Sequence, residues 1–168
     1  MALTGWLRES DDIDYLRNGG LPFAVPSGAF GAPSEFDTRP IINVENQGNT
    51  SSCVGHATSS AIEACAWIAA RMSGDAQPEQ FSRWFAYLQA QKAGGMLGSD
   101  NGATMSGAAQ AMKAVGCCKE STLPFPGRYV KTIPAAAVQE ASQFKIATHA
   151  SLSGYQQAFD FMAGGFGG

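Results

Sequence analysis

The chain has 168 residues, of which 45% are hydrophobic and 15% charged, and its formal net charge is −3. This composition predicts one folded domain and excludes a disordered chain. No cluster of Lys and Arg indicates a nucleic-acid partner, no apolar run reaches the roughly 18 residues of a membrane span, and the N-terminus has no recognisable secretory signal. We therefore expect peptide or protein partners, and a location in the cytoplasm or within a particle.

The predicted elements begin after a leader. Residues 1–35 are rich in Gly and Pro turn formers and predict a short N-terminal leader, followed by a folded domain over residues 36–168. Ser51 and Ser52 are N-cap candidates for an alanine-rich helix that starts at Cys53. Apolar residues recur along this helix at three- and four-residue spacing and predict its core face at positions 54, 57, 61, 64, 65 and 68.

The same periodicities predict the rest of the chain. The first helix is expected to end near residue 72, before Gly74, and two more helices are expected at residues 79–93 and 104–115. The later elements are a strand at 129–133, a short helix from Pro134, a strand-like segment at 144–148 and a helix near 154–163. Met and aromatic side chains on these helices are predicted to be core residues, and we expect no metal and no cofactor.

The four cysteines are Cys53, Cys65, Cys117 and Cys118. They are too few and too unevenly spaced for a secreted disulfide framework, and a bridge between the neighbours 117 and 118 would be strained. Reduced thiols are therefore expected.

Cys53 differs from the others because it stands at a helix start. Unpaired N–H groups and the helix dipole favour thiolate over thiol there, and thiolate is the nucleophilic form. Gln47 lies six residues earlier, so its side-chain amide and the Cys53 N–H could together hold the oxyanion of a tetrahedral intermediate. A small thiol at a helix start, without any catalytic role, is the alternative that this chemistry leaves open.

The run Asn46-Gln47-Gly48-Asn49-Thr50-Ser51-Ser52-Cys53-Val54-Gly55-His56-Ala57 resembles the active-site segment of papain-like (C1 family) cysteine peptidases, especially their bacterial and phage branch. The resemblance implies that Cys53 is the nucleophile and Gln47 the oxyanion-hole side chain, and it places Ser51 in the substrate site.

A second segment, Asn101-Gly102-Ala103-Thr104-Met105, resembles the substrate-binding loop of the same family. The resemblance implies that Asn101 belongs to this site and that Gly102 and Ala103 supply backbone for an extended peptide. It also implies that Met105 lines the pocket for the second residue before the cut.

The fold implied is α+β: a papain-like helical left subdomain with only the start of the right, β-barrel subdomain. The sequence departs from the family at two positions, because Thr50 and Asp100 stand where a pair of bridging cysteines is usual. No disulfide is therefore expected across the active-site loop.

A catalytic histidine is the missing part. In papain-like enzymes it follows the cysteine by about 130–150 residues, which would be beyond Gly168. His56 matches a packed family position and His149 is predicted to face solvent. We therefore expect a peptidase domain truncated before its histidine strand, with the base supplied by a C-terminal part or by a partner chain that completes the fold. The alternatives are a self-sufficient unusual site and a catalytically inactive papain-like interaction or structural protein, such as a virion component.

Overall fold

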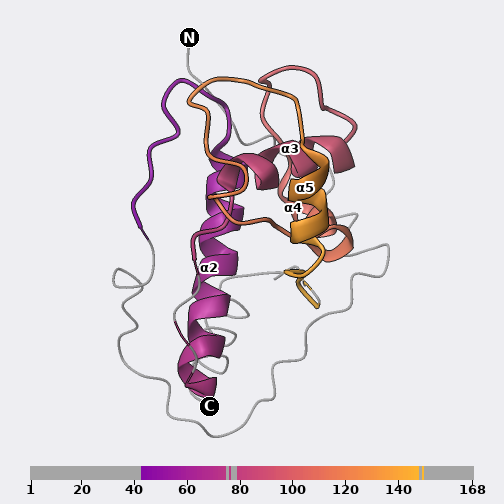
Figure 1. Cartoon of the computed structure of the whole chain (residues 1–168). Helices are drawn as coiled ribbons and strands as arrows, with labels where there is room; N and C mark the ends of the chain where they lie inside the picture. The colour runs from indigo at the N-terminus through magenta and orange to yellow at the C-terminus, as the bar shows by residue number, and fades with distance from the viewer. Residues whose placement is uncertain (1–42, 75, 77–78, 148, 150–168) are drawn as a thin grey trace, which may run out of the picture. The chain divides into compact units, whose positions relative to one another are not determined.

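The structure is a computed structural model that describes residues 43–147 and 149, with gaps at 75, 77 and 78. The chain divides into two compact units, and residues 43–147 lie in the first of them. Their helices are α2 (Cys53–Ser73), α3 (Arg83–Ala93), α4 (Met105–Ala114) and α5 (Ala135–Ala141) (Figure 1). The predicted leader at 1–35 and the predicted helix near 154–163 lie outside the described residues.

Helix α2 confirms the helix predicted from Cys53 onward. Its end at Ser73 is set by Gly74, which adopts φ 77° and donates its N–H to the Ala70 carbonyl. Glycine is suited to this left-handed conformation because it lacks a Cβ. Ser52 occupies the predicted N-cap position, but its side chain makes no capping hydrogen bond.

The next two helices begin where side chains cap them. Ser82 Oγ accepts the Phe85 N–H at 3.0 Å, and Thr104 Oγ1 accepts the Gly107 N–H at 3.0 Å. Capping of this kind satisfies an N–H that has no partner within the helix. Helix α3 therefore begins at residue 83 and not at 79 as predicted, while α4 begins within one residue of the prediction.

The predicted core face of α2 is confirmed at Val54 and wrong at three other positions. Ala57, Ala61 and Cys65 are exposed, whereas Thr58 and Glu63 are buried together with Val54. The buried face thus runs one position further along the helix, where polar side chains find hydrogen-bond partners. Thr58 Oγ1, for example, donates to the Val54 carbonyl at 2.7 Å.

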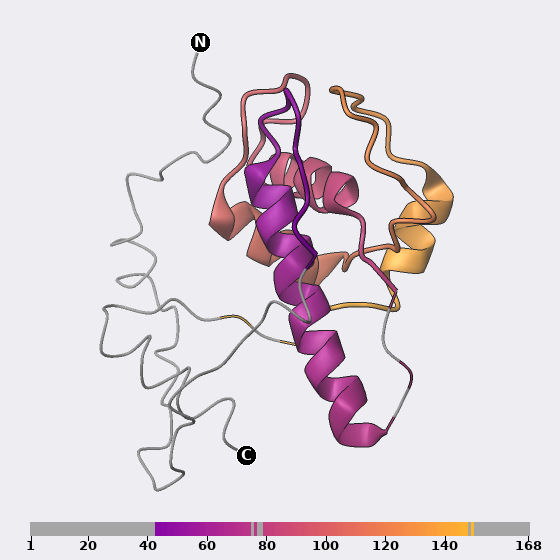
Figure 2. The ribbon, with the colours of Figure 1, turned by 90° about the vertical axis from the view of Figure 1, so that its left-hand side faces the viewer.

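Helix α3 is the central element. Every residue from 84 to 91 is buried, and both views show α3 beside the N-terminal half of α2 (Figures 1 and 2). Two glycines allow this close packing. A Cβ on Gly55 of α2 would lie 2.4 Å from the Arg83 carbonyl oxygen, and one on Gly107 of α4 would lie 2.8 Å from the Ala90 carbonyl oxygen.

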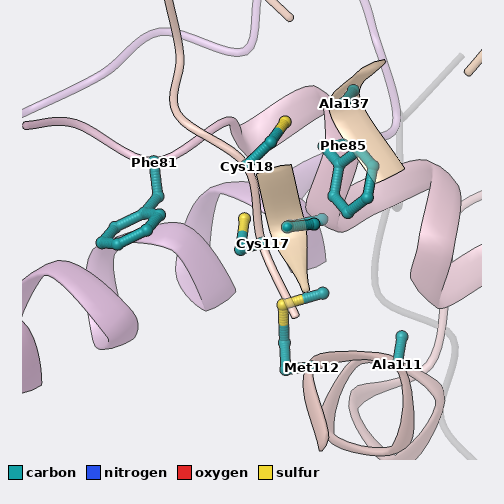
Figure 3. Packing of buried hydrophobic residues seen from close by; sticks show 9 residues of the cluster. Phe81, Phe85, Ala111, Met112, Cys117, Cys118 and Ala137 are labelled. Carbon is teal, nitrogen blue, oxygen red and sulfur yellow. The ribbon is translucent and has the colours of Figure 1, made fainter. Parts of the chain in front are cut away.

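One core cluster joins α3, α4 and α5 with the segment after α4 (Figure 3). Its labelled members are Phe81, Phe85, Ala111, Met112, Cys117, Cys118 and Ala137. Burial raises the pKa of the neighbouring thiols Cys117 and Cys118. For Cys118, burial is the largest cause and the charge of Glu140 the second, and together they raise its pKa to about 12. These thiols are packing groups, and all four cysteines are free, which confirms the prediction of reduced thiols.

The strand prediction at 129–133 is wrong, and residues 144–147 are likewise not a strand. Their backbone groups bond to side chains and helix ends: Trp84 Nε1 donates to the Val130 carbonyl at 2.9 Å, and the Ile146 N–H donates to the Met112 carbonyl at 3.3 Å. Within the described residues of 43–147, the helical part of the predicted α+β fold is present and no strand is formed; β-structure there consists of isolated bridge positions, which include the pair Phe81 and Lys119 and also Ala103. None of the described helices has both the length and the apolar character needed to cross a membrane.

Three carboxylates surround Arg83 and fix the junction of α2, α3 and the segment after α4. Arg83 Nη1 lies 2.8 Å from Glu45 Oε1, and Nη2 lies 3.1 Å from Glu120 Oε1. The third carboxylate, Glu63, accepts the Phe81 N–H at 2.8 Å. Burial is the main cause that raises the pKa of Glu63. The hydrogen bond from the Phe81 N–H and the charge of Arg83 lower this pKa, and the charges of Glu45 and Glu120 raise it, with a net rise.

Replacing Glu63 with glutamine is expected to stabilise the protein at neutral pH. A raised pKa means that the folded state binds the proton more tightly than the unfolded chain, so the ionised carboxylate lowers stability at pH values above its folded pKa. Glutamine keeps an acceptor for the Phe81 N–H and removes the charge. We expect the free energy of unfolding to rise by about 1 kcal/mol or less at neutral pH.

The measurement is urea unfolding of both proteins at neutral and at acidic pH, where the difference should disappear as wild-type Glu63 becomes protonated. Glu79→Gln is the matched control, because Glu79 is exposed and its ion pair with Lys119 lies at the protein surface. A loss of stability in Glu63→Gln at neutral pH would contradict the prediction.

Candidate functional site

Cys53 is the first residue of α2 and is half-buried. It packs against a core cluster formed by Val54, Trp84, Tyr87, Leu88, Ala90, Ala103 and Ala108. The predicted nucleophile and the predicted substrate-binding residue Ala103 therefore border the same cluster, although they are fifty residues apart in the sequence. The two segments singled out by the sequence are brought together by the fold.

The expectation that the helix start by itself favours the Cys53 thiolate is wrong. Burial raises the pKa of Cys53, and the backbone N–H groups of Val54 and of Cys53 itself lower it by less. The helix start thus supplies the donors that were expected, but loss of hydration outweighs them. A thiolate at neutral pH then requires an additional positive charge beside the sulfur.

The loop before Cys53 is closed by Gln47 and Thr50. Gln47 Nε2 donates to the Thr50 carbonyl at 2.9 Å, and Thr50 Oγ1 donates back to the Gln47 carbonyl at 2.8 Å. Gly48, at φ 56°, allows the chain to turn between them. The Gln47 amide nitrogen carries a second N–H, so its bond to Thr50 orients the side chain while one donor remains for an oxyanion.

Ser51 is 4% exposed, and its backbone N–H donates to both carboxylate oxygens of Asp100, at 3.0 and 3.1 Å. The Thr50 and Ser52 hydroxyls lie 2.7 Å apart beside it. Ser51 thus links the predicted nucleophile loop to the predicted substrate loop through its main chain.

The substrate loop is shaped around Gly102. This residue has φ 92°, its N–H donates to Tyr87 Oη at 3.1 Å, and its carbonyl accepts from Gln91 Nε2 at 3.0 Å. Both backbone groups of Gly102 are therefore engaged within the protein. The next residue, Ala103, is fully buried.

Two other predicted residues of this loop are at the surface. Asn101 is exposed, and its Nδ2 donates to Ser99 Oγ at 2.8 Å. Met105, the first residue of α4, is 51% exposed. An exposed thioether side chain is suited to contact apolar side chains of another molecule.

The two histidines, His56 and His149, have different surroundings. His56 Nδ1 lies 3.0 Å from the Ser52 carbonyl oxygen and 3.2 Å from Ser52 Oγ, and its ring packs edge-on against Phe125 at 5.2 Å between centroids. These contacts agree with the packing role expected for His56. His149 is half-buried and does not simply face solvent as predicted. It belongs to the second compact unit.

Sequence reasoning missed three residues that organise the site: Tyr87, Gln91 and Asp100. Tyr87 and Gln91 are fully buried, and Tyr87 donates to Asp100 Oδ1 at 2.7 Å. Asp100 was noticed only because it stands where a bridging cysteine was expected. The signal for the other two was their i, i+4 spacing on α3, because two buried polar side chains on one helical face require partners. Within the described residues, no group of three or more His, Cys, Asp or Glu side chains could hold a metal ion.

Comparisons with known proteins bear on the fold of this chain. No protein-family model and no curated protein matches the sequence. The fold is similar to the crystal structure of xylellain, a cysteine protease from Xylella fastidiosa, with a TM-score of 0.71 and 20% identity. The match covers 96% of this chain and 62% of that chain, so this chain spans under two thirds of the length of its structural neighbour. The chain therefore has the fold of a cysteine protease.

Proposed function

We propose that this chain carries the nucleophile-bearing part of a papain-like cysteine peptidase, which hydrolyses peptide bonds through an acyl-enzyme on Cys53. The observation that carries the proposal is the position of Cys53 at the N-terminus of α2; burial raises the pKa of its thiol, and the backbone N–H groups of Val54 and Cys53 act against that rise. The cysteine-protease fold supports it. Residues 36–168 would form the peptidase domain, preceded by the leader at 1–35.

In the proposed reaction an imidazole removes the Cys53 thiol proton, and the thiolate attacks the scissile carbonyl carbon. The carbonyl electrons move to oxygen, and the Gln47 amide and the Cys53 N–H donate hydrogen bonds to this oxyanion. The tetrahedral intermediate collapses, the peptide amine leaves with the proton from the imidazolium, and a thioester to Cys53 remains. Water, deprotonated by the same imidazole, then hydrolyses the thioester and restores the thiol.

For the substrate side, we assign side-chain recognition to Met105, which is exposed, and a packing role beneath the loop to Ala103, which is fully buried. The Gly102 N–H is already bonded to Tyr87, so Gly102 acts by shaping the loop. Asn101 lies at the exposed edge, and Ser51 supports the nucleophile loop through its main chain. An extended peptide with an apolar residue two positions before the cut fits this assignment.

The raised pKa of Cys53 favours a second candidate, a catalytically inactive protein that keeps the fold for interaction or assembly, for example within a virion. A buried thiol without a cationic partner is mainly protonated at neutral pH and is a poor nucleophile. The catalytic interpretation therefore depends on an imidazolium, from His149, from a C-terminal part or from a partner chain.

The rate of alkylation of each cysteine by iodoacetamide, followed by peptide mass mapping across neutral and mildly acidic pH, separates the two candidates. Cys65 is exposed on the same helix and is the internal reference. A peptidase with a thiolate–imidazolium pair should alkylate Cys53 faster than Cys65 at mildly acidic pH, despite its lower exposure. If Cys53 reacts more slowly than Cys65 over the whole range, this chain by itself forms no thiolate–imidazolium pair, and the inactive candidate is favoured when adding a C-terminal part or partner chain does not restore the fast reaction. A loss of the fast reaction in His149→Ala, but not in His56→Ala, would identify the base.

A further inference from the structure

Two loops meet at a single carboxylate. We call residues 47–53 the nucleophile loop and residues 98–103 the substrate loop. Asp100 accepts the backbone N–H of Ser51, 49 positions away in the sequence, and also the hydroxyl of Tyr87. Asp100 is thus the point of contact between the segment that carries Cys53 and the segment proposed to hold the peptide.

Further hydrogen bonds connect Tyr87 to the substrate loop. Tyr87 Oη accepts the Gly102 N–H at 3.1 Å and one N–H of Gln91 at 2.9 Å, while donating its own proton to Asp100. A hydroxyl has one donor and two acceptor sites, so these three bonds use its full capacity. Burial, together with the hydrogen bond to Asp100, raises the pKa of Tyr87 and keeps it protonated.

We propose that Asp100 is a positioning residue, which holds the nucleophile loop against the substrate loop so that Cys53 and Ala103 keep one relative geometry. The functional purpose of this link rests on the proposed peptidase activity, whereas the bonds that form it do not. By resemblance, positions 50 and 100 are where papain-like relatives carry a disulfide. Here an anionic hydrogen-bonded link joins the same two loops, and it does not depend on the redox state.

A carboxylate suits this position because it offers several acceptor sites on two oxygens, and charge-assisted hydrogen bonds are the stronger ones. Asp100 uses them for a main-chain donor on one side and a buried phenol on the other. An asparagine would keep one acceptor oxygen without the charge. Asp100→Asn should therefore weaken the link, and Asp100→Ala should remove it.

The test measures amide hydrogen exchange by mass spectrometry in the full chain and in its variants. In Asp100→Ala, the Ser51 and Gly102 amides are expected to lose protection together, by about tenfold or more each. Tyr87→Phe should expose only the Gly102 amide. Glu140→Ala is the matched control, since Glu140 also accepts a backbone N–H, that of Lys119 at 3.1 Å, and only this amide should lose protection.

A second readout separates positioning from a general structural role. Burial is the main cause of the raised Cys53 pKa, so loosening the two loops should hydrate the thiol. The pH midpoint of Cys53 alkylation in Asp100→Ala should then fall, with a smaller fall in Asp100→Asn, and should stay unchanged in Glu140→Ala. If Asp100→Ala does not fold, Asp100→Asn carries the test with a smaller expected effect.

The proposal is overturned if the Ser51 and Gly102 amides keep their protection in the Asp100 variants. It is equally overturned if the Cys53 midpoint is unchanged in them, or moves as far in Glu140→Ala. Addition of dithiothreitol should leave both readouts of the wild type unchanged. If the wild-type bonds are present and no peptide is cleaved, the proposed peptidase function fails while the positioning role of Asp100 stands.

Discussion

Replacing Cys53 with alanine is expected to abolish peptide hydrolysis, with kcat/KM falling by about 10⁴-fold or more. The proposed acyl-enzyme forms on the Cys53 sulfur, and alanine leaves no nucleophile at the start of α2. The measurement, made with the part that supplies the base present, is hydrolysis of a fluorogenic peptide with an apolar residue two positions before the cut. Cys65→Ala removes an exposed thiol from the same helix and should leave the rate unchanged.

Gln47→Ala in the same assay separates oxyanion stabilisation from the nucleophile. Loss of one oxyanion donor typically lowers kcat by about 10²–10³-fold. The rate of Cys53 alkylation by iodoacetamide should change little, because no oxyanion forms in that reaction. Gln110→Ala, at an exposed position on α4, is the matched control. Full hydrolytic activity in either Cys53→Ala or Gln47→Ala would remove the corresponding residue from the mechanism.

Gly55→Ala is expected to give the largest loss of stability, about 3 kcal/mol in the free energy of unfolding. The added Cβ would lie 2.4 Å from the Arg83 carbonyl oxygen and 2.6 Å from Tyr87 Cβ, so α2 and α3 must move apart. In an unhindered helix the same change would be stabilising by up to about 1 kcal/mol, and the contact with α3 reverses the sign. Urea unfolding measures the difference.

Gly55 also places the nucleophile. It lies two residues after Cys53, and its close contact with α3 sets how near the start of α2 is to Tyr87. Gly55→Ala should therefore also disturb the site, seen as loss of amide protection at Ser51. Ala57→Ser adds one heavy atom at an exposed position of the same helix and should change stability by less than about 0.5 kcal/mol. A Gly55→Ala protein as stable as wild type would contradict the close helix contact.

Local signals predicted the helices well, because their causes are local. The alanine-rich stretch before Gly74 forms α2, and the stretch after Pro134 forms α5. Glycine and proline act through the backbone of neighbouring residues, so their effects are visible in the sequence. The start of α3 was missed by four residues, because Phe81 pairs with Lys119, almost forty residues away, and the chain stays extended up to the Ser82 cap.

The candidate site likewise has features that the sequence predicted and features that depend on tertiary packing. The sequence alone identified Cys53 at a helix start and the loop from Gln47, and the resemblance to papain-like peptidases implied that the motif around Gly102 would join them. It could not predict the balance of burial against N–H donors that raises the Cys53 pKa, because burial depends on what packs against the thiol.

Tertiary structure also decided which face of α2 is buried and what holds the two loops together. Glu63 is a core residue because the Phe81 N–H and Arg83 meet it there. Asp100 joins the loops because the fold brings the Ser51 N–H and Tyr87 to its two oxygens. Helical periodicity and turn chemistry act between near neighbours and can be predicted from the sequence. Burial and the pairing of polar groups depend on residues far apart in the chain, and only the folded structure determines them.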